Sequence, residues 1–134
     1  MQLKHANLVT PDVAASAQFF QRFFGFDIVD KRGADALAVM RDQDNFVLTL
    51  MKSKKSDPDR YPQTFHVGFY FDSAELVNAK RAELVAAGLS PGEVETTNRG
   101  GAVATFYCVC PGGIIVEVCT PPGFLNERPL AIAG

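Results

Sequence analysis

The chain repeats one order of secondary structure, and this internal repeat limits the folds open to it more than any other feature. Each half is expected to run as a strand, a helix and then further strands, which predicts two βαβββ modules at about 1–52 and 63–121. A polar segment with two prolines, 52–62, is predicted to link them. We therefore expect an α+β fold in a single domain, 1–134.

The first module is predicted to open with a strand over 3–9 and a helix over 12–24. Thr10, Pro11 and Asp12 form a helix-start signal, and Gly25 is typical of the position just past a helix end. Strands are expected near 27–31, 36–41 and 45–51. Apolar residues at helical spacing mark the core face of the helix: Val13, Ala17, Phe20 and Phe24.

The second module is predicted to open with a strand over 64–71. Asp72, with Glu75 three residues later, resembles a capping box that starts a helix running to about residue 87, and Gly88 is expected to end it. Strands are expected near 92–96, 102–110 and 114–120. The apolar side of the helix is expected to hold Leu76, Val77, Leu84 and Val85.

Aligning the modules places functional residue types at matching positions. His5 and His66, the only two histidines, fall at equivalent places in the two first strands. Segment 46–50 matches 114–118, so Thr49 in the first module corresponds to Glu117 in the second. Because strand side chains alternate sides, His66, Gly68 and Tyr70 share a polar, roomy face that is expected to line a cavity.

Glu117 is the most informative single residue because it is an acid within an apolar strand. Burying a bare carboxylate is costly unless a cation or hydrogen-bond donors compensate its charge. An exposed glutamate on an edge strand is the alternative, just as a strand histidine is more often a structural residue than a ligand. The two histidines and the acid together favour a site for one divalent metal, Fe, Mn, Co, Ni or Zn.

Composition excludes other classes of function. The net charge is −2 and no basic stripe is present, so nucleic-acid binding is not expected. No apolar run approaches the length of a membrane span, and the N-terminal residues lack a signal-peptide core. Cys108, Cys110 and Cys119 are too few for a disulfide framework and too poorly spaced for a zinc site. We expect them to be free and buried in a cytoplasmic protein.

Several segments resemble the vicinal-oxygen-chelate superfamily, which includes glyoxalase I, fosfomycin-resistance transferases, extradiol dioxygenases and bleomycin-resistance proteins. The resemblance covers nearly the whole chain. In the last segment, Cys110 and Gly112 replace the two acids of the family's Asp-Pro-Asp-Gly turn, which is expected to alter the turn and not the ligand that follows. The segments that carry the resemblance are 4–8 with 10–12, 19–26, 65–69 and 106–117.

This resemblance implies a cup-shaped, curved mixed sheet with flanking helices, and a homodimer. It also implies metal ligation by His5, His66 and Glu117. Tyr107 falls where these enzymes often carry a tyrosine that contacts substrate, although a core tyrosine is the alternative. The residues expected to contact substrate, with Glu117 and Tyr107 as catalytic groups, are Asn7, Thr49, Tyr70 and Tyr107.

Departures from the family's patterns leave the reaction open. Thr49 stands where glyoxalase I carries a fourth, glutamate ligand, and no further histidine is present for dioxygenase chemistry. Arg99 and Arg128 lie in regions that could recognise an anion, but neither aligns with the family's phosphonate-binding residues. The sequence favours a metal-dependent lyase, transferase or dioxygenase acting on a small oxygen-bearing molecule. The alternative is a metal-free binding protein of the bleomycin-resistance kind.

Overall fold

The computed structural model describes residues 1–58 and 60–131. The chain forms two compact units, residues 1–65 with 109–115, and residues 66–108 with those from 116 onward. Each unit is built on one predicted βαβββ module, and the described residues hold two α-helices and eight strands in two mixed sheets. This architecture confirms the predicted α+β class and the internal repeat.

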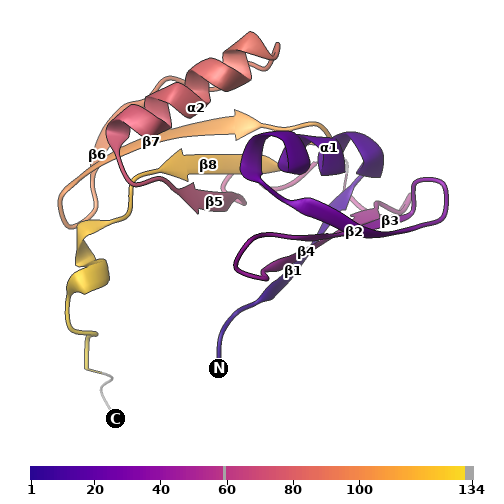
Figure 1. The fold of residues 1–134 in the computed structure, drawn as a ribbon, viewed down its shortest axis with the longest axis horizontal. Helices are drawn as coiled ribbons and strands as arrows, with labels where there is room; N and C mark the ends of the chain where they lie inside the picture. The colour runs from indigo at the N-terminus through magenta and orange to yellow at the C-terminus, as the bar shows by residue number, and fades with distance from the viewer. Residues whose placement is uncertain (59, 132–134) are drawn as a thin grey trace. The chain divides into compact units, whose positions relative to one another are not determined.

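The first unit holds a four-stranded sheet in the order β1-β4-β3-β2. The outer strand β1 pairs in parallel with β4, and the other pairs are antiparallel. Helix α1 packs on β2, β3 and β4, as Figure 1 shows. The elements are β1 (His5–Thr10), α1 (Val13–Phe24), β2 (Asp27–Arg32), β3 (Leu37–Arg41) and β4 (Val47–Lys52).

Helix α1 begins and ends where the sequence predicts. The side chain of Asp12 accepts a hydrogen bond from the backbone N–H of Ala15 at 3.0 Å and so caps the first turn. Gly25 ends the helix in the left-handed conformation, with φ 71°. Val13, Ala17 and Phe20 are buried as predicted, and Phe24 is half-buried.

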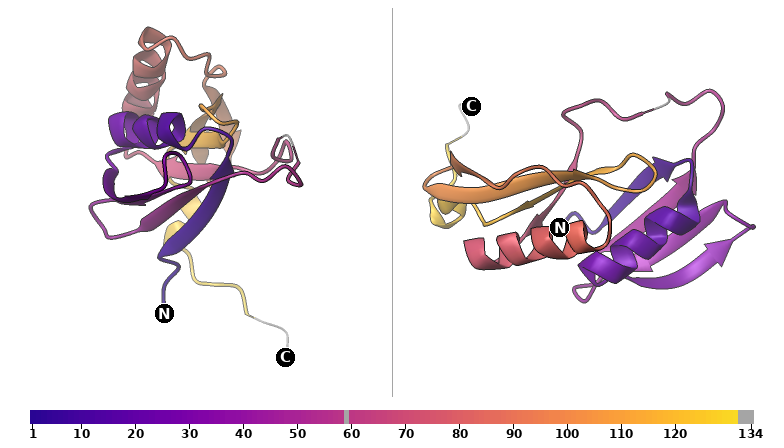
Figure 2. Two further views of the ribbon diagram at one scale, coloured as in Figure 1. Left: turned by 90° about the vertical axis from the view of Figure 1, so that its right-hand side faces the viewer. Right: turned by 90° about the horizontal axis from the view of Figure 1, so that it is seen from above.

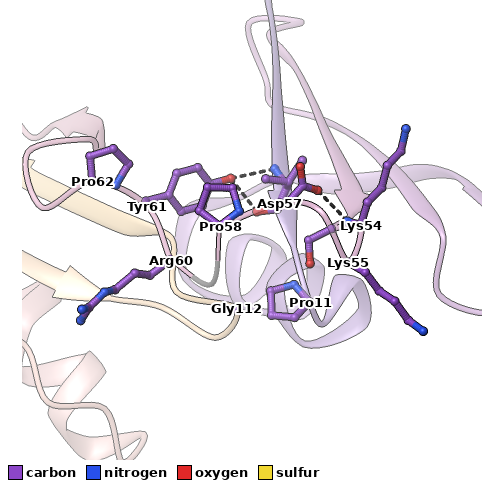
Figure 3. A pocket seen from close by; sticks show the side chains of 11 residues that line it. Pro11, Lys54, Lys55, Asp57, Pro58, Arg60, Tyr61, Pro62 and Gly112 are labelled. Carbon is purple, nitrogen blue, oxygen red and sulfur yellow. Dashed lines mark hydrogen bonds between the residues drawn. The ribbon is translucent and has the colours of Figure 1, made fainter.

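Tyr61, from the segment after β4, closes the open edge of β1. Its hydroxyl accepts a hydrogen bond from the backbone N–H of Val9 at 2.7 Å and donates one to the Val9 carbonyl at 2.5 Å (Figure 3). The ring of Phe65 stacks on the Tyr61 ring, with centroids 4.9 Å apart. The segment predicted as a linker is therefore attached to the first sheet through Tyr61.

The second unit holds a four-stranded sheet in the order β5-β8-β7-β6, with β5 parallel to β8 and β6 antiparallel to β7. Helix α2 lies along this sheet in the views of Figure 1 and Figure 2. The elements are β5 (Val67–Tyr70), α2 (Ala74–Ala86), β6 (Glu95–Asn98), β7 (Ala102–Val109), β8 (Ile115–Cys119) and a short 3-10 helix, η1 (Gly123–Asn126).

Two predictions for helix α2 are wrong. Its N-cap is Ser73 and not Asp72, because the Ser73 hydroxyl accepts the backbone N–H of Leu76 at 3.2 Å. The buried side is also narrower than predicted, since Val77 and Leu84 are fully buried while Leu76 and Val85 are each 48% exposed. A single buried stripe is sufficient where a helix covers only one face of a sheet.

The register of the sheets confirms the alignment of the two modules. Asn7 is the cross-strand partner of Thr49, and Gly68 is the partner of Glu117. The histidines lie two residues before Asn7 and Gly68, so the two units repeat one arrangement of positions. Neither described helix has the length and apolar composition needed to cross a membrane.

Candidate metal centre

Glu117 lies in the middle of β8 and is only 6% exposed, so of the two alternatives left by the sequence, the buried acid is the one observed. Gly68 on the adjacent strand β5 is its cross-strand partner. A Cβ atom added at Gly68 would lie 3.9 Å from Oε1 of Glu117, an ordinary contact. A side chain longer than that of alanine at residue 68 would therefore occupy the space beside Oε1 of Glu117.

The second carboxylate oxygen of Glu117 is held by two donors. Arg99 donates Nη2–H to Oε2 at 2.9 Å, and the Thr105 hydroxyl donates to the same oxygen at 2.8 Å. Burial raises the pKa of Glu117, but hydrogen bonds from Arg99, Thr105 and Tyr107 outweigh burial and bring the pKa below its ordinary value. The carboxylate is therefore ionised and compensated within the second unit.

The first carboxylate oxygen of Glu117 faces a histidine. His66 Nε2 lies 3.6 Å from Oε1 of Glu117. The Tyr107 ring stands edge-on to the His66 ring, with centroids 5.3 Å apart. Burial and the nearby Glu117 carboxylate raise the pKa of Tyr107. His66, Tyr107 and Glu117, three of the residues predicted from sequence, are thus brought together.

The first unit carries a neutral counterpart of this pair. His5 Nε2 lies 3.2 Å from the Thr49 hydroxyl oxygen, in the same relative positions as His66 and Glu117. Thr49 supplies a neutral oxygen where the second unit supplies a carboxylate. A divalent cation gains much more from the anionic oxygen, so the second unit holds the stronger half of the predicted ligand set.

His66 and Glu117 have the donor chemistry that a divalent transition metal requires. Imidazole nitrogen and carboxylate oxygen suit the predicted metals, and Nε2 and Oε1 are close enough for one ion to bind both. Among residues 1–58 and 60–131, no cluster of three or more His, Cys, Asp or Glu side chains is arranged to hold a metal ion. His5 belongs to the other unit, so its place in a three-ligand set stays a prediction.

Sequence reasoning missed the role of Arg99 and Thr105 as partners of Glu117. Thr105 precedes Tyr107 by two residues on β7, so strand periodicity alone places both on one face. Arg99 comes from the turn after β6, where no periodicity applies. Tyr70 is 60% exposed and Asn7 is also exposed, so their predicted contacts with substrate stay predictions.

The three cysteines are buried thiols that form no disulfide, as predicted. Burial and the charge of Glu117 raise the pKa of Cys119 to about 11, and burial alone raises that of Cys108. The thiols of Cys108 and Cys119 are therefore protonated and are poor nucleophiles near neutral pH.

A hollow in the first unit is lined by none of the predicted site residues. It has a volume of about 270 Å³ and lies beside the segment that carries Tyr61 (Figure 3). Prolines and cationic side chains surround it, and Lys54 and Lys55 extend outward in the view of Figure 3. The residues able to perform metal chemistry lie instead around Glu117, in the other unit.

Comparison with known proteins places the chain in a family. The model of the Glyoxalase/Bleomycin resistance protein/Dioxygenase superfamily matches residues 2–127, and the chain belongs to this superfamily. The predicted resemblance is therefore confirmed. The superfamily includes lyases and oxidases or dioxygenases, which makes an enzymatic function the leading expectation. The comparison with curated proteins gave no significant match.

Solved structures with the same fold support this assignment. A possible glyoxalase from Bacillus cereus is 41% identical, with a TM-score of 0.76 over 88% of this chain and 97% of that one. Lactoylglutathione lyase from Agrobacterium tumefaciens is 19% identical, with a TM-score of 0.69 over 95% and 97% of the two chains. A family enzyme from Burkholderia phytofirmans is 17% identical, with a TM-score of 0.72 over 90% and 98%. The last two likenesses concern the fold alone.

Proposed function

We propose that this protein is a metal-dependent enzyme that acts on a small oxygen-bearing molecule chelated to a divalent metal. His66 and Glu117 would hold the metal, with His5 as the third ligand. The observation that carries the proposal is the pair formed by His66 Nε2 and Oε1 of the buried Glu117, 3.6 Å apart beside Tyr107. When bound, the metal supplies Lewis-acid polarisation of a substrate oxygen.

The surrounding residues define what the protein itself contributes. Thr105 and Arg99 fix the Glu117 carboxylate through Oε2 and leave Oε1 toward His66. Tyr107 is 41% exposed, so a ligand at this site can reach it. Its hydroxyl hydrogen-bonds Glu117 and would turn from it to donate its one hydrogen bond to negative charge that develops on the substrate. Asn7, Thr49 and Tyr70 remain the other proposed substrate contacts.

Metal titration tests the proposal directly. Protein stripped of metal is titrated with Mn(II) and with Zn(II) by calorimetry, beside His66→Ala and His5→Ala variants. We expect one metal per chain in the wild type, with weaker binding in both variants because each loses a ligand. Unchanged affinity in His66→Ala would remove the proposed site, and unchanged affinity in His5→Ala alone would limit it to the second unit.

A metal-free binding protein is the second candidate. The observation that favours it is the ion pair between Arg99 and Glu117, because this pair already compensates the buried charge without a metal. Such a protein would bind its ligand equally well with and without a chelator such as EDTA. Loss of ligand affinity in EDTA, restored by Mn(II), would exclude it.

Tyr107→Phe is expected to lower ligand affinity or turnover much more than folding stability. The phenol loses a donor toward charge, worth about 1–3 kcal/mol if it contacts the ligand. Stability should change little because the side chain is partly exposed. A melting curve of the same variant without ligand is the control for folding. A melting temperature several degrees lower with unchanged ligand affinity would instead identify Tyr107 as a structural residue.

We also propose that the protein works as a homodimer in the cytoplasm. The support is the superfamily membership, together with open sheet edges that need cover and three cysteines that form no disulfide, which suits a reducing compartment. Light scattering at micromolar concentration is expected to give twice the chain mass. A monomer would require both histidines and Glu117 to bind the metal within one chain.

A further inference from the structure

The ion pair between Arg99 and Glu117 lies at the proposed metal ligand and is unlike the other ion pairs of the second unit. The Glu117 side chain is 8% exposed, whereas the acids paired with Lys80 and Arg81 are 48% and 85% exposed. Exposed ion pairs contribute little to folding stability. A cation beside a buried carboxylate, by contrast, changes how strongly that carboxylate can bind a second cation. Arg99 is itself 33% exposed, so its guanidinium can be approached from solvent.

The backbone holds Arg99 in this position. Its N–H donates to the Gly101 carbonyl at 2.9 Å, and its carbonyl accepts the N–H of Gly123 at 2.9 Å. Gly100 and Gly123 pack so closely that a Cβ on Gly123 would lie 1.9 Å from the Gly100 carbonyl oxygen. Asn98 closes the turn by accepting the Gly101 N–H. Arg99 therefore projects from a turn that is fixed at both ends.

We propose that Arg99 is a resident counter-cation of Glu117 that weakens metal binding and makes the metal-loaded site select a small oxyanion, of the carboxylate or phosphate class. This inference rests on the proposed function. Glu117 carries −1 and Arg99 carries +1, so their net charge is zero before metal binds. A neutral imidazole from His66 adds no charge, and a divalent ion then brings this group of residues to +2.

Two consequences follow from that charge. The metal meets a carboxylate whose attraction is partly cancelled by a cation 2.9 Å away, so it binds more weakly than it would to Glu117 alone. An incoming anion is attracted both by the metal and by Arg99. Because the guanidinium presents several N–H groups in one plane, it can bind oxygens of the anion while keeping its contact with Oε2.

Charge-removing and charge-keeping variants test this inference. Arg99→Gln removes the cation, Arg99→Lys keeps it, and Arg81→Gln removes an exposed arginine of the same unit as a matched control. Metal-stripped proteins are titrated with Mn(II), and the Mn(II)-loaded proteins are then titrated with oxalate and with inorganic phosphate. Circular dichroism melting checks that each variant is folded.

We expect Arg99→Gln to bind Mn(II) about tenfold or more tightly and to bind the better anion about tenfold or more weakly than wild type. Arg99→Lys should stay within about threefold of wild type for Mn(II), because the charge is kept, but should bind the anion more weakly, because a single ammonium lacks the planar set of N–H donors. Arg81→Gln should stay within about threefold of wild type in both titrations. Whether oxalate or phosphate binds better distinguishes the carboxylate from the phosphate class. If Arg99→Gln does not fold, the positive charge at residue 99 is tested instead by measuring the anion affinity of Arg99→Lys at increasing salt concentration. We expect that affinity to fall as salt screens the charge.

The results also separate this inference from the proposed function. Equal or weaker Mn(II) binding by Arg99→Gln, or unchanged anion affinity, would overturn the role of Arg99 while leaving a metal site intact. Mn(II) binding by Arg99→Gln but not by wild type would support the role of Arg99 and contradict a metal-dependent function of the natural protein. Equal Mn(II) binding by wild type, Arg99→Gln and His66→Ala would overturn both.

Discussion

Glu117→Gln is expected to abolish stoichiometric metal binding and to destabilise the metal-free protein by about 1–3 kcal/mol. The amide is nearly the same shape as the carboxylate but cannot carry charge. It offers one oxygen acceptor in place of two and leaves Arg99, which lies 2.9 Å from Oε2, without its anion. Calorimetric titration with Mn(II) and urea unfolding of the metal-free protein measure the two effects.

A matched control shows whether the loss of stability in Glu117→Gln is specific to the buried pair or would follow from breaking an exposed glutamate–arginine pair as well. Glu93 pairs with Arg81 at 3.1 Å but is 85% exposed, so Glu93→Gln should change stability by no more than about 0.5 kcal/mol. From sequence alone, a gain of stability on replacing Glu117 was possible, because a buried acid without a partner would be relieved by the amide. Arg99 and Thr105 supply partners, which fixes the expected sign. A stabilised variant that keeps metal affinity would contradict both the ion pair and the site.

The same replacement should change the response to acid. The pKa of Glu117 is lowered from its ordinary value of 4.5, so its ionised form stabilises the folded state above that pH. This contribution is lost as the pH falls through the lowered pKa. Stability of the metal-free wild type should therefore fall more steeply below about pH 5 than that of Glu117→Gln. Parallel curves would show that the ionisation of Glu117 does not contribute.

Gly112→Ala is expected to destabilise the first unit by about 3–5 kcal/mol. Gly112 has φ 88°, and a Cβ there would lie 2.0 Å from the Thr10 hydroxyl oxygen and 2.5 Å from that of Ser16. These hydroxyls are not free to move, because they are buried and lie 2.8 Å apart, and Ser16 also bonds the Pro111 carbonyl. The substitution thus combines backbone strain with a steric clash.

The next residue provides the control for this clash. Gly113 has a similar φ of 82°, but apart from its chain neighbours no residue of the described part of the chain has an atom within 4 Å of an added Cβ. Gly113→Ala should therefore cost only the conformational strain, about 1–2 kcal/mol. Urea unfolding of both variants separates the two contributions. Equal losses would show that Thr10 and Ser16 rearrange to admit the methyl group.

The order of elements was predictable from sequence because it depends on local signals. Helix α1 has an Asp12 cap, a phenylalanine-rich face and a terminal Gly25, and all three act as predicted. Strand ends were less predictable, since β5 begins at Val67 and not at residue 64. Local signals also placed the N-cap of helix α2 one residue too early, because Asp72 and Ser73 are both good capping residues.

The candidate site was predictable only where residues lie on paired strands. His66 comes directly before β5, and the parallel register of β5 and β8, which the internal repeat anticipates, brings it close to Glu117. Arg99 reaches Glu117 from a turn, and its contact depends on how Gly100 and Gly123 pack. No periodicity in the sequence encodes that packing. From the sequence we could expect that some group compensates the charge of the buried Glu117. Only the structure shows that this group is Arg99.

The attachment of Tyr61 to β1 has a consequence for association between chains. β1 is an outer strand, and the backbone N–H and carbonyl of Val9 are the groups that an incoming strand would bond. The single hydroxyl of Tyr61 hydrogen-bonds both the N–H and the carbonyl of Val9. Strand addition at this end of β1 is thereby blocked, which protects this part of the sheet edge from pairing with another chain.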